Sequence, residues 1–399
     1  MSKLLIVGGG IGGLAAALAL ADHHHEVLVL ERNPVFAEIG AGIQLAPNAF
    51  TALDVLGVGE AVRAQAVFLD EMRLMDALTG APIALVDLGE RFVARFGHRY
   101  AVVHRHDIHA PLLRACRDHP SIELRAGCDV VGYEQDEHGI RVVASNGERI
   151  AGTALIGADG LRSAIRAQLL GDGPPRISGH TIYRSVVRAA DVPEAMRAPT
   201  VTLFAGPKYH LVHYPIAGGK LINIAATVDN GARQAVAGEP VAQARVRAAF
   251  TTLANAPRTL LDCGRDWKSW VLCDRDPTGI WTDGRVALLG DAAHPMLQYA
   301  AQGAAMALED AVALRHLLDI EPVGVAELFR RYNAVRFRRT ARIQDISRFM
   351  GEAIYHPSAS RADERTRRIA ALGTEGLYDA VDWLYRYSGD TATRHLLAA

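Results

Sequence analysis

The sequence contains few cysteines, no excess of either charge and no long apolar run. Its four cysteines form no CxxC pair and lie at no zinc-ligand spacing from a histidine, which argues against a disulfide framework and a metal site. With 43 basic and 44 acidic residues the formal net charge is −1, so the composition favours neither nucleic acid nor an anionic membrane as a partner. No stretch approaches the roughly 20 apolar residues of a membrane span, and glycines interrupt the apolar N-terminus where a signal peptide needs a continuous apolar segment. We therefore expect a cytoplasmic protein, without a membrane segment, that binds a small molecule.

The N-terminus has the pattern of a dinucleotide-binding unit. An apolar run at residues 4–7 predicts a short buried strand, and an Ala/Leu-rich run to about Ala21 predicts a helix. Between them stand Gly8, Gly10 and Gly13. The first permits a tight turn, the second lets a pyrophosphate approach the backbone, and the third lets the helix pack closely on the strand.

An acidic residue follows at the spacing that such a unit requires. A second predicted strand, residues 27–30, ends in Glu31, which stands 23 positions after Gly8. An acid roughly 20 residues after the first glycine holds the ribose hydroxyls of a nucleotide. The N-terminus of the intervening helix offers free N–H groups to the phosphates. This pattern alone does not distinguish FAD from NAD.

Three further segments place charged residues at the ends of apolar strands. In YAVVHRHD, Arg105 ends a β-like run, and Asp107 precedes a Leu-rich helix that it can cap. In ALIGADGLRSAIR, Asp159 and Gly160 form a tight turn before a helix, and in GRVALLGDAAHPM a strand delivers Asp291 into a Gly-Asp turn. A carboxylate in this turn can cap the following helix, and that role alone would explain Asp159; a cofactor contact is the alternative explanation.

The segments GGGIGG, GADGLRSAIR and GDAAHP stand in the order found in the group A flavoprotein aromatic hydroxylases, the para-hydroxybenzoate and salicylate hydroxylase superfamily. The chain resembles this family along essentially its whole length. The resemblance implies an α/β fold, in which a Rossmann-like (GR2-type) FAD-binding domain carries an inserted β-sheet substrate domain and C-terminal helices. It also implies a homodimer.

The residue pattern of the chain indicates where these units lie. Segments with β-like alternation of apolar and polar residues, and with turn glycines, separate the cofactor segments. We assign residues 1–72, 100–177 and 275–325 to the FAD-binding domain. Residues 73–99 and 178–274 form the substrate domain, and residues 326–399 form the helical C-terminal region.

The resemblance also implies roles for individual residues toward FAD. The pyrophosphate is held at the glycine turn, the adenosine ribose at the end of the second strand, and the ring between two loops. The implied cofactor-binding residues are Gly8, Gly10, Ile11, Gly12, Gly13, Glu31, Arg32, Gly42, Ile43, Gln44, Arg105, Val130, Asp159, Asp291, Gly303 and Ala304. No second GxGxxG is present, so NADH or NADPH is expected to bind transiently as a co-substrate, with O₂ as the oxidant.

The stretch KYHLVHYPI predicts a strand whose residues alternate between two faces. His210 and Tyr214 then share a face. In the family, the flavin captures O₂ as a C4a-hydroperoxide, and a base that deprotonates a substrate phenol makes the ring electron-rich enough to react. A histidine suits this task at neutral pH.

The pattern YHLVHYP and the glutamine at position 298 resemble the 3-hydroxybenzoate 6-hydroxylases of the family, which make gentisate; many salicylate-type relatives have proline at that position. The resemblance implies His210 as the base and Gln298 as its partner at the substrate oxygen. Tyr214 is expected to anchor the carboxylate or to line the pocket.

Other functions stay open at this point. Salicylate 1-hydroxylase and 6-hydroxynicotinate 3-hydroxylase perform oxidative decarboxylation with the same cofactor. A flavin-free NAD dehydrogenase is disfavoured by Arg105 together with the GDAAHP turn. A non-catalytic dinucleotide-binding protein would keep the glycine turn without the chemistry.

Overall fold

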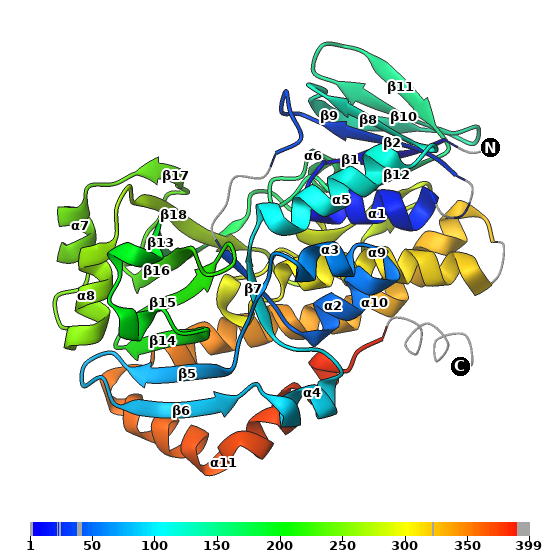
Figure 1. Ribbon diagram of the computed structural model, residues 1–399. Helices are drawn as coiled ribbons and strands as arrows, with labels where there is room; N and C mark the ends of the chain where they lie inside the picture. Colours follow the sequence, from blue (N-terminus) through cyan, green and yellow to red (C-terminus); the bar gives the residue numbers. More distant parts are fainter. Residues whose placement is uncertain (1–2, 22, 24, 38–41, 321–322, 389–399) are drawn as a thin grey trace.

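The computed structural model describes most of the chain (Figure 1), namely residues 3–21, 23, 25–37, 42–320 and 323–388. Parts of the predicted units, among them residues 38–41 and 389–399, lie outside the described residues.

A six-stranded sheet forms the centre of the N-terminal part. Its strands, in spatial order, are β19 (Thr282–Asp283), β20 (Val286–Leu288), β12 (Ala154–Gly157), β1 (Lys3–Val7), β2 (Glu26–Glu31) and β8 (Ile122–Ala126). All pair in parallel except β19, which runs antiparallel to β20. Strands such as β1 are continuous apolar runs because both faces of a parallel sheet are covered.

Helix α1 (Ile11–Ala21) packs on one side of this sheet, against α5 (His106–Asp118) and α9 (Gly303–Ile320). Its small alanines allow this close packing, and all its residues except Gly12 are buried. The opposite side is covered by a small antiparallel sheet (Figure 1). Its strands are β9 (Val130–Gln135), β10 (Ile140–Ala144) and β11 (Arg149–Gly152).

The start of α5 differs from our prediction. The helix begins at His106 with Arg105 at the N-cap, so Asp107 lies inside the first turn instead of before the helix. The carboxylate of Asp107 accepts a hydrogen bond from the backbone N–H of His104, at 3.2 Å. An acid in the first turn is still favourable, because it faces the positive end of the helix dipole.

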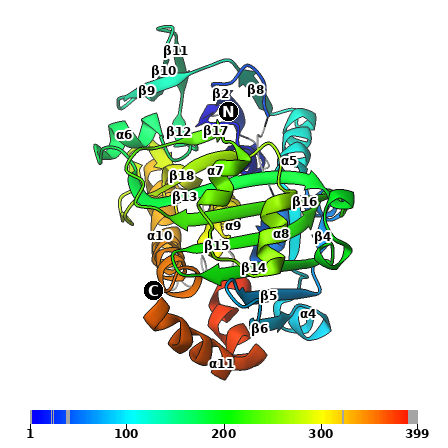
Figure 2. The ribbon, with the colours of Figure 1, turned by 90° about the vertical axis from the view of Figure 1, so that its left-hand side faces the viewer.

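An eight-stranded sheet forms the second half of the molecule (Figure 2). Its order is β17 (Ala237–Pro240), β18 (Lys268–Asp274), β13 (Arg176–Arg188), β16 (Leu221–Asp229), β15 (Tyr209–Ile216), β14 (Thr200–Gly206), β5 (Glu71–Asp76) and β6 (Pro82–Asp87). Two separate stretches of the chain therefore build one sheet. Helices α7 (Gln243–Ala248) and α8 (Asn255–Cys263) cover its outer face (Figure 2).

The register of this sheet decides which side chains share its inner face. His210 pairs with Thr227, and Tyr214 pairs with Asn223, on neighbouring antiparallel strands. Arg184 of β13 pairs with Ala225 of β16, which pairs with Val212, so Arg184 shares this face in the row between His210 and Tyr214. Since residues directly opposite one another point to the same side, these polar groups line one face. The predicted alternation that puts His210 and Tyr214 together is confirmed.

A short sheet joins the two halves. Its strands are β3 (Gly42–Leu45), β7 (Ala101–His104) and β4 (Val67–Phe68), and the chain enters helix α2 (Pro47–Val55) directly after β3. The C-terminal region follows as α10 (Val325–Phe349), a π-helical turn η5 (Met350–Tyr355) and α11 (Ala359–Tyr385). α10 packs on α9, and α11 packs on β6.

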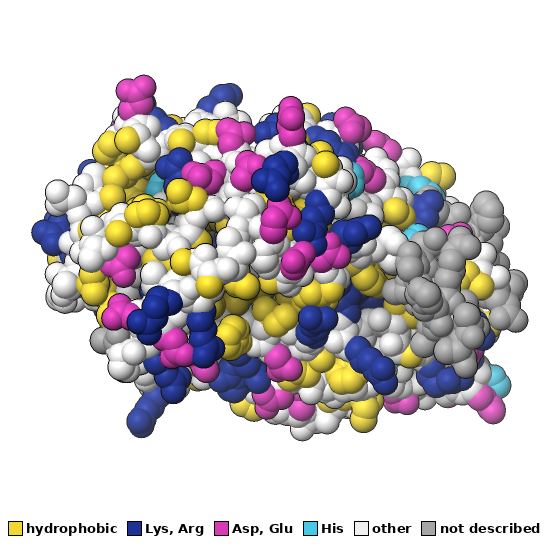
Figure 3. All heavy atoms as spheres, turned by 90° about the horizontal axis from the view of Figure 1, so that it is seen from below, with side chains coloured by type: hydrophobic (Ala, Val, Ile, Leu, Met, Phe, Trp, Pro, Cys, Tyr) yellow, Lys and Arg dark blue, Asp and Glu magenta, His cyan; other side chains and the backbone are white. Residues whose placement is uncertain are grey.

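The side of the molecule formed by β6 and α11 is seen in Figure 3, where hydrophobic side chains lie among basic and acidic ones. Within the described residues no helix is long and apolar enough to cross a bilayer. Those residues also contain no group of three or more side chains suited to hold a metal ion. The predicted fold class is confirmed, and we propose the three predicted units as its domains.

Candidate active site

The glycine turn after β1 is a cradle that side chains would fill. Gly8 has φ of +112°, and a Cβ there would collide with the carbonyl oxygen of Ala158. A Cβ at Gly13 would collide with the carbonyl oxygen of Gly8. A Cβ at Gly12 would come within 2.8 Å of Leu289 Cδ2 and 3.2 Å of Ala307 Cβ in α9. Gly10 lies in the turn itself and Ile11 begins α1, so the helix dipole points at the turn.

Glu31 lies at the end of β2, beside this turn. Its Oε2 accepts the N–H of Gly9 at 2.8 Å, and its Oε1 accepts the N–H of Asn33 at 2.9 Å. The neighbouring Arg32 is exposed. Val130, the first residue of β9, is near Glu31 because Cys128 N–H donates to the Glu31 carbonyl, at 2.9 Å. The predicted ribose and adenine residues therefore lie together.

The carbonyl of Gly9 is held by a residue that the sequence reading missed. His109 of α5 is buried, and its Nε2 lies 2.8 Å from the Gly9 oxygen. A carbonyl only accepts, so His109 carries its proton on Nε2. Its position, one helical turn after Arg105, was the only signal available in the sequence.

Among the buried polar atoms that have no hydrogen-bond partner within the described residues, one on Asp159 and one on Gln302 suit a cofactor contact. Asp159 caps α6 (Ala164–Leu170) through Oδ2, which accepts the N–H of Ala164 at 2.8 Å, but its Oδ1 is buried without a partner. Burial raises the pKa of Asp159. Gln302 uses Oε1 to accept from Asn48 at 2.9 Å, and its Nε2 is also buried without a partner. Buried polar atoms of this kind require a partner, and a bound cofactor supplies one.

The GDAAHP segment is held from beneath by Asp310 of α9. Asp310 Oδ2 accepts from the N–H of Gly290 at 3.0 Å and from His294 Nε2 at 2.6 Å, and Oδ1 accepts from Arg336 at 2.7 Å. Burial alone would raise the pKa of Asp310, but His294 and Arg336 outweigh it and lower the pKa to about 2. Asp291 takes no part in this buried network and is exposed at the surface of the turn.

Asp291 also lies close to the start of α9, since a Cβ on Gly303 would be 3.9 Å from its Oδ1. Gly303 is the first residue of α9 and is followed by the half-buried Ala304. The N–H groups at this helix start and the carboxylate of Asp291 therefore face the same space. The glycine turn, the two orphaned atoms and this helix start together fit FAD.

The segment Gly42–Gln44 is tied to the substrate sheet. The Tyr214 hydroxyl donates to the carbonyl of Gly42 at 2.8 Å, and the N–H of Gly42 donates to Asn223 at 3.1 Å. Tyr100 donates to Gln44 Oε1 at 2.9 Å, while Ile43 is half-buried. The hydroxyl proton of Tyr214 is donated to the Gly42 carbonyl in this arrangement. Tyr214 therefore holds the loop and does not donate to a carboxylate here. Burial raises the pKa of Tyr214 to about 12.

Gln298 bonds to the sheet face through both ends of its amide. Its Oε1 accepts from Arg184 at 2.6 Å, and its Nε2 donates to Thr227 at 3.4 Å. Thr227 is the cross-strand partner of His210, so Gln298 lies beside the histidine without a hydrogen bond to it. Arg105 lies close enough for its charge to act on Arg184. The sequence reading did not single out Arg184.

His210 is buried and lies in a cluster of rings. Its Nδ1 is 2.7 Å from Nε2 of His356, and its ring centre is 5.6 Å from that of Tyr299 and 5.2 Å from that of Tyr355. Burial, helped by the charge of the nearby His180, lowers the pKa of His210 to about 3. At neutral pH His210 is therefore an uncharged imidazole.

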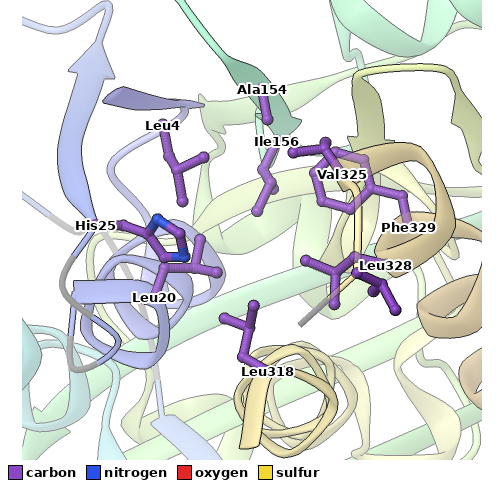
Figure 4. Close-up of a pocket in the computed structure, with 10 residues that line it drawn as sticks. Leu4, Leu20, His25, Ala154, Ile156, Leu318, Val325, Leu328 and Phe329 are labelled. Carbon is purple, nitrogen blue, oxygen red and sulfur yellow. The ribbon is translucent and has the colours of Figure 1, made fainter. Parts of the chain in front are cut away.

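A separate cavity of about 60 Å³ lies at the other end of the six-stranded sheet (Figure 4). Leu4, Leu20, Ala154, Leu318 and Phe329 are among its lining residues, and His25 is the polar side chain among those lining residues that the structure describes. Ligands of open α/β sheets bind at the carboxyl ends of the strands, where the glycine turn lies. This apolar cavity at the amino ends has no part in the site.

Comparison with known proteins agrees with this site. A family model described as an FAD binding domain matches residues 1–347. The chain is 47% identical to 3-hydroxybenzoate 6-hydroxylase 1 of Aquipseudomonas alcaligenes, covering 96% of this chain and 97% of the relative. It is 42% identical to 3-hydroxybenzoate 6-hydroxylase of Polaromonas naphthalenivorans, covering 96% of each. Among solved structures, an HpxO variant of Klebsiella pneumoniae complexed with FAD matches with a TM-score of 0.86 and 25% identity, covering 96% of this chain and 98% of that one.

These matches extend over nearly the whole chain and include both the cofactor half and the substrate half. The predicted FAD cofactor and the predicted monooxygenase class are confirmed. This chain belongs to the family of FAD-dependent aromatic hydroxylases.

Proposed function

We propose that this hydroxylase converts 3-hydroxybenzoate into gentisate, by inserting oxygen para to the phenol. The observation that carries the proposal is the inner face of the substrate sheet, where His210, Gln298 and Arg184 lie together. Such a face offers an uncharged base for a phenol and a cation for a carboxylate. Relatives at 42–47% identity that bear this activity in their names support the choice of substrate.

We propose that the cofactor residues act as predicted from the family resemblance. The glycine turn would hold the pyrophosphate, Glu31 the ribose, and Val130 the adenine. Arg105 and Asp291 would bind the ribitol phosphate, while Gln44 and Gly303 would lie at the ring. When bound, FAD supplies an electrophilic oxygen from O₂ at the expense of NADH or NADPH.

The task left to the chain is to make the aromatic ring electron-rich. Removing the phenol proton places electron density ortho and para to the oxygen, so a base within hydrogen-bond reach accelerates the reaction. His210 is neutral at pH 7, since burial lowers its pKa to about 3, and a neutral imidazole has a lone pair to accept the proton. The amide of Gln298 lies next to it and would hold the substrate oxygen.

The cation at the site favours an acidic substrate. Burial lowers the pKa of Arg184, and its protein contacts within the described residues are the neutral amide of Gln298 and the ring of Trp270, 5.9 Å away. A half-buried guanidinium that lacks a carboxylate partner within the described residues is favourably placed to bind an anion. We assign Arg184 to the substrate carboxylate, in place of Tyr214.

The function is tested with the purified FAD-loaded enzyme, 3-hydroxybenzoate, salicylate, 6-hydroxynicotinate and 4-hydroxybenzoate. We expect NADH or NADPH oxidation to be stimulated most by 3-hydroxybenzoate, with gentisate as the product. Catechol from salicylate, or a dihydroxypyridine from 6-hydroxynicotinate, as the main product would overturn the proposal in favour of oxidative decarboxylation. A homodimer and a cytoplasmic location stay predictions.

Replacing Arg184 with methionine should lower kcat/KM for 3-hydroxybenzoate. A hydrogen bond to a charged group contributes about 1.5–3 kcal/mol, which corresponds to a loss of roughly 10- to 100-fold, mostly in KM. The matched control is Arg188→Met, which changes an exposed arginine on the same strand. Steady-state kinetics with 3-hydroxybenzamide, which lacks the negative charge, should show little difference between Arg184→Met and wild type; an equal loss with both compounds would contradict the assignment.

A further inference from the structure

The base of the proposed reaction is hydrogen-bonded to a second buried histidine that comes from a distant part of the chain. His210 Nδ1 and His356 Nε2 are 2.7 Å apart, and the two rings are tilted by 33°. His356 follows the π-helical turn η5 directly, and its N–H donates to the carbonyl of Gly351 at 3.0 Å. Such turns are rare and often occur at functional sites.

A glycine allows this turn to reach the substrate sheet. A Cβ at position 351 would lie 2.6 Å from the ring of Tyr299, so only glycine lets η5 pack against that ring. Tyr299 is adjacent to Gln298 in the chain, and its hydroxyl lies 2.6 Å from Nδ1 of His180. The turn and the substrate-facing loop are therefore packed on one another, which sets the position of His356 next to His210.

We propose that His356 is a positioning residue for His210 and that the two histidines form a relay, which carries the phenol proton of the substrate from His210 to water. This inference rests on the proposed function, since it requires a phenolic substrate whose proton His210 removes.

The hydrogen bond between the rings determines which nitrogen of each carries a proton. For His210 to accept a proton at Nε2, that atom must hold a lone pair, so the proton of His210 is on Nδ1 and is donated to His356 Nε2. His356 then carries its own proton on Nδ1. This Nδ1 is buried and has no hydrogen-bond partner among the described residues. A buried donor of this kind needs an acceptor, and a water molecule at that position supplies one.

The transfer balances without leaving a charge on either ring. The substrate O–H bond breaks as an N–H bond forms at His210 Nε2. The His210 Nδ1–H bond breaks as an N–H bond forms at His356 Nε2. The His356 Nδ1–H bond breaks as its proton passes to water. Both histidines end as neutral imidazoles with their protons moved to the other nitrogen.

A neutral relay suits the surroundings of the pair. Burial and the charge of His180 lower the pKa of His210, and burial and the charges of His210 and His180 lower the pKa of His356. An imidazolium on either ring is therefore disfavoured. The groups that face the pair or the adjacent His180 are Tyr299 of η4 (Gln298–Ala300), Tyr355 and Glu352 of η5, Asp229 of β16 and Arg176 of β13. His180, whose ring centre is 5.0 Å from that of His356, is half-buried, so the side of the pair next to His180 is nearer to solvent than His210 itself.

The test follows proton release when 3-hydroxybenzoate is mixed with the oxidised FAD-loaded enzyme, in stopped flow with a pH indicator and without NADH or NADPH. Wild type should release a proton on binding. In His356→Gln, whose amide oxygen still accepts from His210 Nδ1, release should slow by about 10²-fold or more, with the FAD content and the affinity for 3-hydroxybenzoate unchanged. His213→Gln, a buried histidine on the opposite face of the same strand, is the matched control and should release at the wild-type rate.

A second variant covers the case in which His356→Gln does not retain FAD. His356→Ala should release the proton slowly, and added imidazole should restore the rate; a purely structural role for His356 gives no such rescue. Proton release in His356→Gln at the wild-type rate, or a slow His356→Ala that imidazole does not rescue, overturns the relay. Absence of proton release in wild type contradicts the proposed base mechanism itself, so the two failures are distinguishable.

Discussion

Replacing His210 with alanine should lower the rate of ring hydroxylation by about 10²- to 10⁴-fold, because a positioned general base typically contributes that factor. The substrate phenol would then lose the imidazole that lies beside Gln298 and would stay protonated. The measurement is gentisate formation per mole of enzyme-bound FAD, together with KM for 3-hydroxybenzoate. We expect kcat to fall much more than the affinity for 3-hydroxybenzoate.

FAD binding should survive this substitution. The contacts of His210 are with His356, Tyr299 and Tyr355, none of which belongs to the glycine turn. His213→Ala is the control, since it removes a buried imidazole from the same strand but on the opposite face. If His210→Ala hydroxylates at the wild-type rate, or if His213→Ala loses as much activity, the base is not His210.

Replacing Arg336 with methionine should destabilise the folded protein by about 3–5 kcal/mol, the cost of removing one partner from a buried ion pair. Arg336 is fully buried and bonds to Glu309 and Asp310, at 2.7 Å each. Its removal would leave excess negative charge on α9, directly beneath the GDAAHP turn. The expected result is a lower midpoint of guanidinium denaturation and weaker retention of FAD.

The same helix offers a matched control. Arg338 is exposed, so Arg338→Met should change stability by no more than about 0.5 kcal/mol, as surface substitutions usually do. Equal denaturation midpoints for the two variants would contradict the importance of the buried network. A lower FAD content in Arg336→Met alone would support the view that Asp310, His294 and Arg336 hold the cofactor turn.

The cofactor half was readable from the sequence because its signals are local. The strand, the three glycines, the helix and Glu31 follow one another within 31 residues, and a backbone that needs positive φ or close approach tolerates only glycine. The alternation in β15 is equally local, so it correctly put His210 and Tyr214 on one face. The helix that was predicted to start after Asp107 begins at His106. Local capping signals locate a helix end only to within one or two residues, which accounts for this error.

The partners of those residues could not be read in the same way. Tyr214 was expected to anchor a carboxylate or to line the pocket, and its hydroxyl bonds to the carbonyl of Gly42, which lies 172 positions away. Gln298 was expected beside His210, and it does lie beside it. Its hydrogen bonds to Arg184 and Thr227 hold it there, and nothing in the sequence connected Gln298 with these two residues. Each contact joins different strands or loops, and no periodicity within one segment reports on such a neighbour.

The sequence by itself therefore determined the nucleotide-binding turn, the cofactor class and the side of the strand that bears His210, because each depends on neighbouring residues and on backbone geometry. Only the tertiary structure decided what surrounds His210. It brings His356 to His210 across 146 positions, and Arg184 to Gln298 across 114. The physical reason is that sheet register and the packing of η5 against Tyr299 set these distances, and both arise only when the two halves of the chain bury their faces together.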